Sequence, residues 1–195
     1  MTAISPLDLI HKKGLFGDHH KKNESDLLNI CEIKDLIIIQ IVQYTKSFIK
    51  LKDIEINGLE FPSDSLKVSS NDTTRILWNA PKTWLIISKD INIMKIINKK
   101  CNTENFAITD ISHSKAIIQL KGNQSKEVLK KGCPINFNNF EKNSCGGSVF
   151  HGISFIVDYV DDKPQTFNLI TLRSFGESFY HHITDSALEF GYIAL

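Results

Sequence analysis

The sequence has no excess of either charge and no long apolar run. Its 23 basic and 22 acidic residues leave a formal charge of +1, so no long-range field draws the chain to nucleic acid or to an anionic membrane. The longest apolar stretch, residues 36–42, is interrupted by Gln40 and is far too short to cross a bilayer. Residues 1–22 contain no apolar segment of signal-peptide length. We therefore expect a cytoplasmic protein that binds neither nucleic acid nor membrane.

The sequence also has none of the short motifs that hold metals or nucleotides. Its four cysteines lie far apart in the sequence: Cys31, Cys101, Cys133 and Cys145. None of them forms a CxxC pair, and the CxxC spacing is the one typical of zinc sites and redox-active thiols. Neither the GxGxxG pattern nor the P-loop pattern occurs. We expect reduced, mostly buried thiols, and no metal or cofactor held by this chain.

The length and composition suit one domain, or two small ones packed as one. The chain has 195 residues, of which 42% are hydrophobic and 23% are charged, ordinary values for a globular protein. Residues 1–25 are polar and show no sustained period, so we expect an extended arm that is loose or ordered only by lying on another surface. Residues 26–195 should form a single duplicated domain.

Residues 109–134 predict a complete strand-helix unit. Residues 116–120 alternate as a strand does. Asn123 is a good helix N-cap, because its side-chain oxygen can accept a bond from a first-turn N–H group. Gly132 suits the left-handed position after a helix, and Pro134 prevents the helix from continuing.

Elements of the same kind recur along the chain. We expect strands at 35–43, 74–79, 83–88, 106–111, 148–151, 154–160 and 166–172, and helices at 44–51, 90–100 and from Arg173 onward, the last with its apolar face at Phe175, Phe179, Ile183, Ala187 and Leu188. Residues 35–100 and 115–190 then share one element order. This repetition predicts an α+β protein of two ferredoxin-like β-α-β-β-α subdomains, 35–105 and 106–195, which could exchange strands, with mixed sheets and helices on one face.

Several stretches carry a family resemblance. They are LWNAPKTWLIIS (77–88), TDISHSKAIIQLKG (109–122), VLKKGCPINF (128–137), VDDKPQTFNLITLRSF (160–175) and ALEFGY (187–192). With these the chain resembles the gamma subunit of heterotetrameric sarcosine oxidase, from about residue 77 to the end. The GCP turn and the RSF helix start are the most specific parts.

The resemblance implies a complex that oxidises sarcosine with oxygen and produces glycine, hydrogen peroxide and either formaldehyde or methylene-tetrahydrofolate. It implies that FAD, FMN, NAD, zinc and tetrahydrofolate belong to the partner subunits and none to this one. It also implies a fold similar to the folate-binding domain of the glycine cleavage aminomethyltransferase, which has a pair of acidic residues near folate. The matching stretch here, residues 146–155, has His151 and no carboxylate, so proton transfer at a folate nitrogen lacks an agent.

Four other residues have side chains that could act in catalysis, but their positions in the sequence favour structural or contact roles. Cys133 lies at the C-terminal end of its helix, which disfavours a thiolate, so we interpret it as a packing residue. Asp161 and Asp162 are expected in a hairpin turn. Arg173, between a strand and a helix, either clamps a carboxylate of a partner chain or forms a surface salt bridge, and the sequence leaves both open.

Two adjacent histidine pairs suggest metal ligation but do not fit it well. His19 and His20 are adjacent, with His11 nearby, and His181 and His182 are adjacent in the last helix. Neighbours on a helix point about 100° apart and do not converge on one ion. We therefore expect no metal at either pair, and we treat His19, His20, His181 and Arg173 as candidate contacts with a partner chain.

The sequence thus favours a structural, non-catalytic gamma subunit docked on the large alpha subunit of a sarcosine oxidase. Two alternatives remain at this stage. One is a standalone folate-binding protein or aminomethyltransferase-like enzyme. The other is a ferredoxin-like regulatory module that associates with itself.

Overall fold

The computed structural model describes residues 5–195, and the first four residues of the predicted arm lie outside the described residues. The chain divides into two compact units. One is Asp35–Ser112, and the other combines residues 5–34 with His113–Leu195. We call them the inserted unit and the terminal unit, because the first lies between the two segments of the second.

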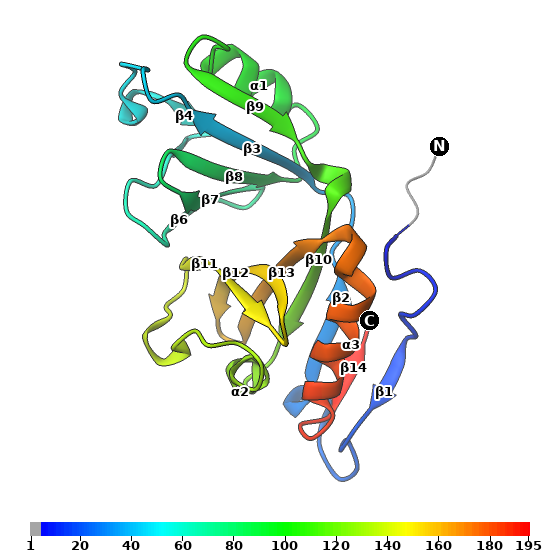
Figure 1. Ribbon diagram of the computed structural model, residues 1–195. Helices are drawn as coiled ribbons and strands as arrows, with labels where there is room; N and C mark the ends of the chain where they lie inside the picture. The colour runs from blue at the N-terminus through cyan, green and yellow to red at the C-terminus, as the bar shows by residue number, and fades with distance from the viewer. Residues whose placement is uncertain (1–4) are drawn as a thin grey trace. The chain divides into compact units, whose positions relative to one another are not determined.

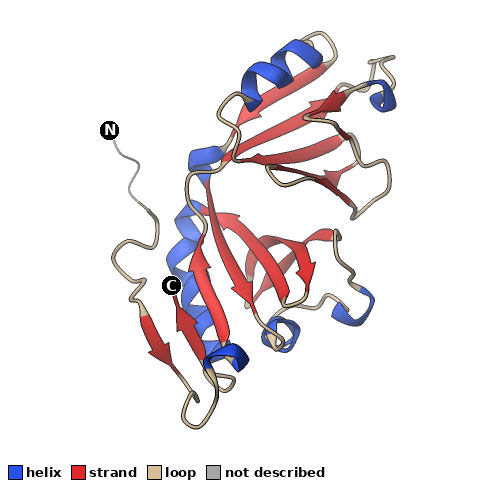
Figure 2. Cartoon of the chain, turned by 180° about the vertical axis from the view of Figure 1, so that it is seen from behind, coloured by secondary structure: helices blue, strands red, loops and turns tan. Residues whose placement is uncertain are grey.

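The inserted unit is a five-stranded antiparallel sheet with one helix (Figures 1 and 2). Its strands, in the spatial order β6-β7-β8-β3-β9, are β6 (Val68–Ser70), β7 (Thr74–Ala80), β8 (Thr83–Ser88), β3 (Ile37–Gln43) and β9 (Phe106–Asp110). A small hairpin of β4 (Glu55–Ile56) and β5 (Leu59–Glu60) follows the 3-10 helix η2 (Leu51–Asp53). The helix α1 (Ile93–Lys100) buries Ile93 and Ile97 in a cluster with Ile39 and Phe106. The predicted hairpin of residues 74–79 and 83–88 is confirmed by the pairing of β7 with β8.

The predicted helix over residues 44–51 is wrong. Local side-chain bonds replace the helical ladder: the Gln43 Nε2 donates to the Ile49 carbonyl oxygen (2.8 Å), and the Ile49 N–H donates to Ser47 Oγ (3.3 Å). Phe48, expected on the buried face, is 97% exposed. Residues 44–50 are therefore a loop.

The terminal unit is built on a seven-stranded sheet. Its strands, in the spatial order β1-β14-β2-β10-β13-β12-β11, are β1 (Gly14–Phe16), β14 (Tyr192–Ala194), β2 (Leu28–Glu32), β10 (Lys115–Lys121), β13 (Gln165–Leu172), β12 (Ile153–Asp162) and β11 (Cys145–Phe150). All neighbours are antiparallel except β14 and β2, which are parallel. The helices are α2 (Ser125–Lys130) and α3 (Gly176–Ala187), with 3-10 turns η1 (Glu24–Asp26), η4 (Phe137–Asn139) and η5 (Arg173–Phe175). A further 3-10 turn, η3 (Ser112–Ser114), begins at the last residue of the inserted unit.

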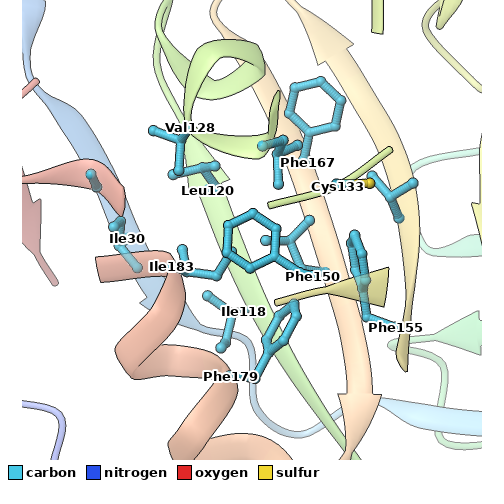
Figure 3. Close-up of a cluster of buried hydrophobic side chains, with 14 of the residues drawn as sticks. Ile30, Ile118, Leu120, Val128, Cys133, Phe150, Phe155, Phe167, Phe179 and Ile183 are labelled. Carbon is cyan, nitrogen blue, oxygen red and sulfur yellow. The ribbon is translucent and has the colours of Figure 1, made fainter. Parts of the chain in front are cut away.

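One hydrophobic cluster joins both helices of the terminal unit to the same face of the sheet. Figure 3 shows Phe150, Phe155 and Phe179 meeting between the strands and α3, with Phe167 further along the same cluster. Aliphatic side chains from β2, β10 and α2 complete the cluster: Ile30, Ile118, Leu120 and Val128. Ile118 and Leu120 lie on the face of β10 that joins this cluster, whereas Ile117, on the opposite face, is buried outside it.

The described part of the predicted arm, residues 5–25, packs on its own unit. Leu7 is fully buried in the cluster, and β1 pairs with β14 along Gly14–Phe16. The Ser5 hydroxyl donates to the Glu32 carboxylate. The segment is extended at β1, and it packs against β14 and the hydrophobic cluster of the terminal unit.

Several local predictions fail for identifiable reasons. Gln124, not Asn123, occupies the N-cap position of α2, and the first turn is closed by Ser125 Oγ donating to the Gly122 carbonyl oxygen (2.7 Å). Gly132 does not adopt the left-handed conformation. Asp161 and Asp162 end β12, and the turn itself is Lys163–Pro164.

The apolar face of the last helix is shorter than predicted. Phe179, Ile183 and Ala187 are fully buried, as expected. Phe175 lies in η5, before the α-helix begins, and it is 47% exposed; Leu188, past the helix end, is also exposed.

The α+β class is confirmed, and the two units share a strand order. In each, the strand that precedes a hairpin (β3 or β10) lies beside the second strand of that hairpin (β8 or β13), which lies beside its first strand (β7 or β12), as in ferredoxin-like folds. The inserted unit has a loop where the first helix is predicted, its sheet is wholly antiparallel, and the terminal unit inserts β2 between β14 and β10. The exact duplication therefore stays a prediction.

Candidate functional site

An open pocket of about 560 Å³ lies where β13 ends and α3 begins. It is lined by Pro6, His113, Ser114, Leu172, Arg173, Ser174 and Glu177. The chain can approach closely here because α3 begins with Gly176: a Cβ on this residue would lie 3.2 Å from the Pro6 Cβ and 3.3 Å from the Ala116 Cβ. The pocket therefore brings together the N-terminal segment, the start of β10 and the start of α3.

Arg173 lines this pocket and is half-buried. Glu177, one helical turn further on, puts a carboxylate on the same wall, so the pocket holds both charges. His113 and Ser114 also line it, although the sequence pattern predicts no site at either residue. The signal available for them was their place in the TDISHSK stretch, which marks a turn before a strand but not a pocket.

A second hollow of about 450 Å³ adjoins the first at Leu172. It is lined by Lys115, Gly147, Ser148, Ser154, Phe155, Ile156, Ile170, Thr171 and Leu172. Burial lowers the pKa of the Lys115 ammonium, because desolvation disfavours its charged form. The hollow is mainly apolar and contains no carboxylate among its lining residues, so it offers no acid-base pair.

The two histidine pairs are separate features of the terminal unit. His181 is exposed, with its Nε2 4.0 Å from the Glu177 Oε1, and an exposed pair of this kind adds little stability. His182 is half-buried and its ring centroid is 5.1 Å from that of His151. The histidines of this pair thus face different surroundings, as their adjacent positions on a helix predict.

His19 and His20, near the N-terminus, do not converge with His11 on a common point. The His19 Nδ1 lies 2.8 Å from the Gly17 carbonyl oxygen, and the rings of His19 and His20 are 4.5 Å apart. His11 contacts other groups: its Nδ1 is 2.8 Å from the Tyr180 hydroxyl and its Nε2 is 2.7 Å from the Leu195 carbonyl oxygen. No group of three or more His, Cys, Asp or Glu side chains able to hold a metal occurs within residues 5–195.

The turn between β11 and β12 lies within residues 146–155, where the resemblance to the aminomethyltransferase predicts a hairpin near folate. His151 lies in this turn with a positive φ of 46°, and its backbone N–H donates to the Gly132 carbonyl oxygen (3.2 Å). Its ring packs edge-on against Phe150, at 4.8 Å between centroids. The first carboxylate along β12 is Asp158, which is fully buried. This hairpin presents no carboxylate of its own to a ligand.

The thiols of Cys31 and Cys101 are poor nucleophiles in this environment. Burial raises the pKa of Cys101 to about 11, and it also raises the pKa of Cys31, where it outweighs the opposite effect of the Lys121 charge. Cys133 is buried, with its Sγ 3.3 Å from Ser148 Oγ. The raised pKa values of Cys31 and Cys101 keep these two thiols protonated near neutral pH, so they react slowly.

No helix within residues 5–195 has both the length and the apolar content needed to cross a bilayer. A search of curated protein sequences found no match. The sequence model of the "Sarcosine oxidase, gamma subunit family" matches residues 51–189. The chain belongs to that family.

Solved structures agree with the fold of this gamma subunit. A chain of the heterotetrameric sarcosine oxidase from Corynebacterium sp. U-96, solved with pyrrole 2-carboxylate, is similar with a TM-score of 0.81 at 18% identity, covering 96% of this gamma subunit and 95% of that chain. The glycine cleavage system aminomethyltransferase T from Bartonella henselae is similar with a TM-score of 0.61 at 8% identity. That match covers 82% of the gamma subunit and 46% of the aminomethyltransferase, so the gamma subunit spans about half of its length.

Within the gamma subunit, the predicted contact residues do not form one cluster. Arg173 lies at the pocket before α3, and His181 lies two turns further along that helix. His19 and His20 lie in the turn region after β1. A partner touching all four residues would need a broad surface on the terminal unit.

Proposed function

We propose that this gamma subunit is a structural, non-catalytic component of a cytoplasmic sarcosine oxidase complex. It docks on the large alpha subunit, and the other subunits bind FAD, FMN, NAD, zinc and tetrahydrofolate. The observation that carries the proposal is the family match over residues 51–189. Fold similarity to a chain of a heterotetrameric sarcosine oxidase over 96% of the sequence supports it.

The non-catalytic part of the proposal rests on the chemistry of the described side chains. The β11–β12 turn offers His151 where a folate enzyme needs an acid, and the nearest carboxylate on β12, Asp158, is fully buried. The cysteines with raised pKa values are not activated nucleophiles. The pocket at Arg173 contains charged groups but no nucleophile paired with a base and an orienting group.

Expression of the chain together with the other subunits tests the docking. We expect the gamma subunit to elute with them in size-exclusion chromatography and to be retained in stoichiometric amount. Elution as a separate species under all conditions would refute the proposal. Sedimentation of the chain alone would reveal the self-associating alternative as a closed oligomer.

Titration of the isolated chain tests the folate alternative, which the aminomethyltransferase-like fold favours. We expect no saturable heat with tetrahydrofolate in the micromolar range and no hydrogen peroxide from sarcosine. Binding in that range, or turnover by the chain alone, would overturn the non-catalytic assignment.

A further inference from the structure

The loop of residues 44–50, between β3 and η2, displays the most exposed large hydrophobic residue among those described. Phe48 is 97% exposed and Tyr44, in the same loop, is 43% exposed. Single exposed apolar residues are normal on protein surfaces. This loop differs because two aromatic side chains occur within five positions and because its backbone is held in place. We call it the Phe48 loop.

The backbone on both sides of Phe48 is fixed by hydrogen bonds. On one side, the Tyr44 N–H donates to the Asn105 carbonyl oxygen (2.8 Å) and the Ser47 N–H donates to the Tyr44 carbonyl oxygen (3.0 Å). On the other side, the Ile49 carbonyl oxygen accepts from Gln43 Nε2 (2.8 Å).

The side chains around Phe48 fix it further. Ile49 is partly buried against the core of the inserted unit, and Gln43, whose amide closes the loop, is buried. Lys82 Nζ donates to the Thr45 carbonyl oxygen (3.3 Å) from the neighbouring β7–β8 turn. Phe48 is therefore held outward by an ordered backbone, and binding through it would need little further ordering of the loop.

The charges of the loop all have one sign. Lys46 and Lys50 are exposed on either side of Phe48, Lys52 follows, and residues 44–52 contain no acidic residue. An aromatic side chain surrounded by cations suits a complementary surface: an apolar pocket that receives the ring and carboxylates around it that meet the lysines.

We propose that the Phe48 loop inserts into an apolar pocket with an acidic rim on another subunit of the sarcosine oxidase complex. The inference rests on the proposed docking function and names the surface through which it occurs. Phe48 acts as the buried anchor, and Lys46 and Lys50 contribute to orientation and to the rate of encounter.

Competition during assembly tests the anchor. A tagged variant and the untagged parent chain are co-expressed with the other subunits, and their ratio in the purified complex is measured by mass spectrometry. We expect Phe48→Ala to be depleted about tenfold or more, since central aromatic anchors dominate interface energies. The matched control is Ile91→Ala, because Ile91 is also apolar, lies in the inserted unit and is 83% exposed; it should be incorporated within about twofold of the parent.

A charge-reversed chain provides a second variant that does not alter the aromatic ring. Lys46→Glu combined with Lys50→Glu should be depleted about fivefold or more. Lys12→Glu combined with Lys13→Glu, at exposed lysines of the terminal unit, should be incorporated like the parent. Thermal unfolding of the free chains checks that Phe48→Ala folds normally.

The outcomes separate the two proposals. If the parent chain enters the complex and Phe48→Ala enters equally well, the loop inference is overturned and the docking function stands. If Ile91→Ala is depleted as strongly as Phe48→Ala, exposure alone explains the effect and the loop inference is again overturned. If the parent chain itself never enters the complex, both proposals fail.

Discussion

Gly132 shows at the scale of one residue how packing, and not backbone conformation, can demand a glycine. A Cβ at this position would lie 2.8 Å from the His151 Cδ2 and 3.0 Å from the Phe150 Cζ. The His151 ring is at the exposed end of a turn and can move, but Phe150 is fully buried. We expect Gly132→Ala to lower the free energy of unfolding by about 1–3 kcal/mol through overpacking, as measured by urea denaturation.

Gly147 provides the matched control for that substitution. A Cβ there would meet nothing within 4 Å, and the residue lies on the edge strand β11. Gly147→Ala should change stability by less than about 1 kcal/mol, since it creates no clash and restricts the unfolded chain. Equal effects of the two substitutions would show that the contact with Phe150 does not matter.

Cysteine labelling should follow burial. Cys31 is the only one of the four cysteines that is not fully buried. With iodoacetamide at pH 8 and peptide mapping, we expect Cys31 to be modified first and Cys101 to stay protected until urea unfolds the chain. Preferential labelling of Cys101 in the folded protein would contradict the structure.

The raised pKa of Cys101 also predicts a pH dependence. Its folded value of about 11 lies above the ordinary value of 9.0, so the unfolded chain loses this proton first as the pH rises. The contribution of this pKa difference to the free energy of unfolding is complete below pH 9 and is lost as the pH approaches 11. Between these limits the free energy of unfolding of Cys101→Ala should fall less steeply than that of the parent chain. Identical slopes would mean that the thiol titrates normally.

At the scale of elements, α3 shows which buried positions the apolar spacing of a sequence predicts correctly and which it does not. Its helical period correctly predicts burial of Phe179 and Ile183 but extends one turn too far, to the exposed Phe175. Phe179→Ala should cost about 3–5 kcal/mol through lost burial and a cavity, measured by urea denaturation. Phe175→Ala should stay within about 0.5 kcal/mol of the parent. A comparable loss in both variants would place Phe175 in the core.

The elements predicted most reliably from the sequence are those with strong local signals. The β7–β8 hairpin and the strand β3, rich in β-branched residues, were predicted nearly to the residue. The helix predicted at residues 44–51 rested on only two apolar positions, Phe48 and Leu51. Hydrogen bonds between the backbone and the side chains of Gln43 and Ser47 hold this segment as a loop. The spacing of apolar residues in the sequence carries no information about such bonds.

The candidate site was less predictable than the fold. Arg173 could be singled out because it stands between a strand and a helix. Its neighbours in the pocket, Pro6 and His113, come from segments far away in the sequence, and a single sequence does not reveal that proximity. The same reason explains why His11 was grouped with His19 and His20, although it contacts Tyr180 and Leu195.

At the scale of the whole molecule, the N-terminal segment is part of the terminal unit and not an appendage. Leu7 is fully buried, whereas Leu9, two residues away, is 93% exposed. Leu7→Ala should therefore lower the free energy of unfolding by about 2–5 kcal/mol, and Leu9→Ala should leave it nearly unchanged. Chemical denaturation of both variants measures the difference. Equal stability of the two would mean that the segment is not anchored.

The place of β2 in the sheet also affects the order in which the protein can fold during synthesis. Residues 28–32 leave the ribosome before the inserted unit, yet their neighbours β10 and β14 are translated only after it. The nascent chain must hold this apolar strand unpaired while the inserted unit folds, and the last strand to emerge closes the sheet beside one of the first. Slow or interrupted translation would prolong the exposure of Leu28 and Ile30, which are buried in the folded protein.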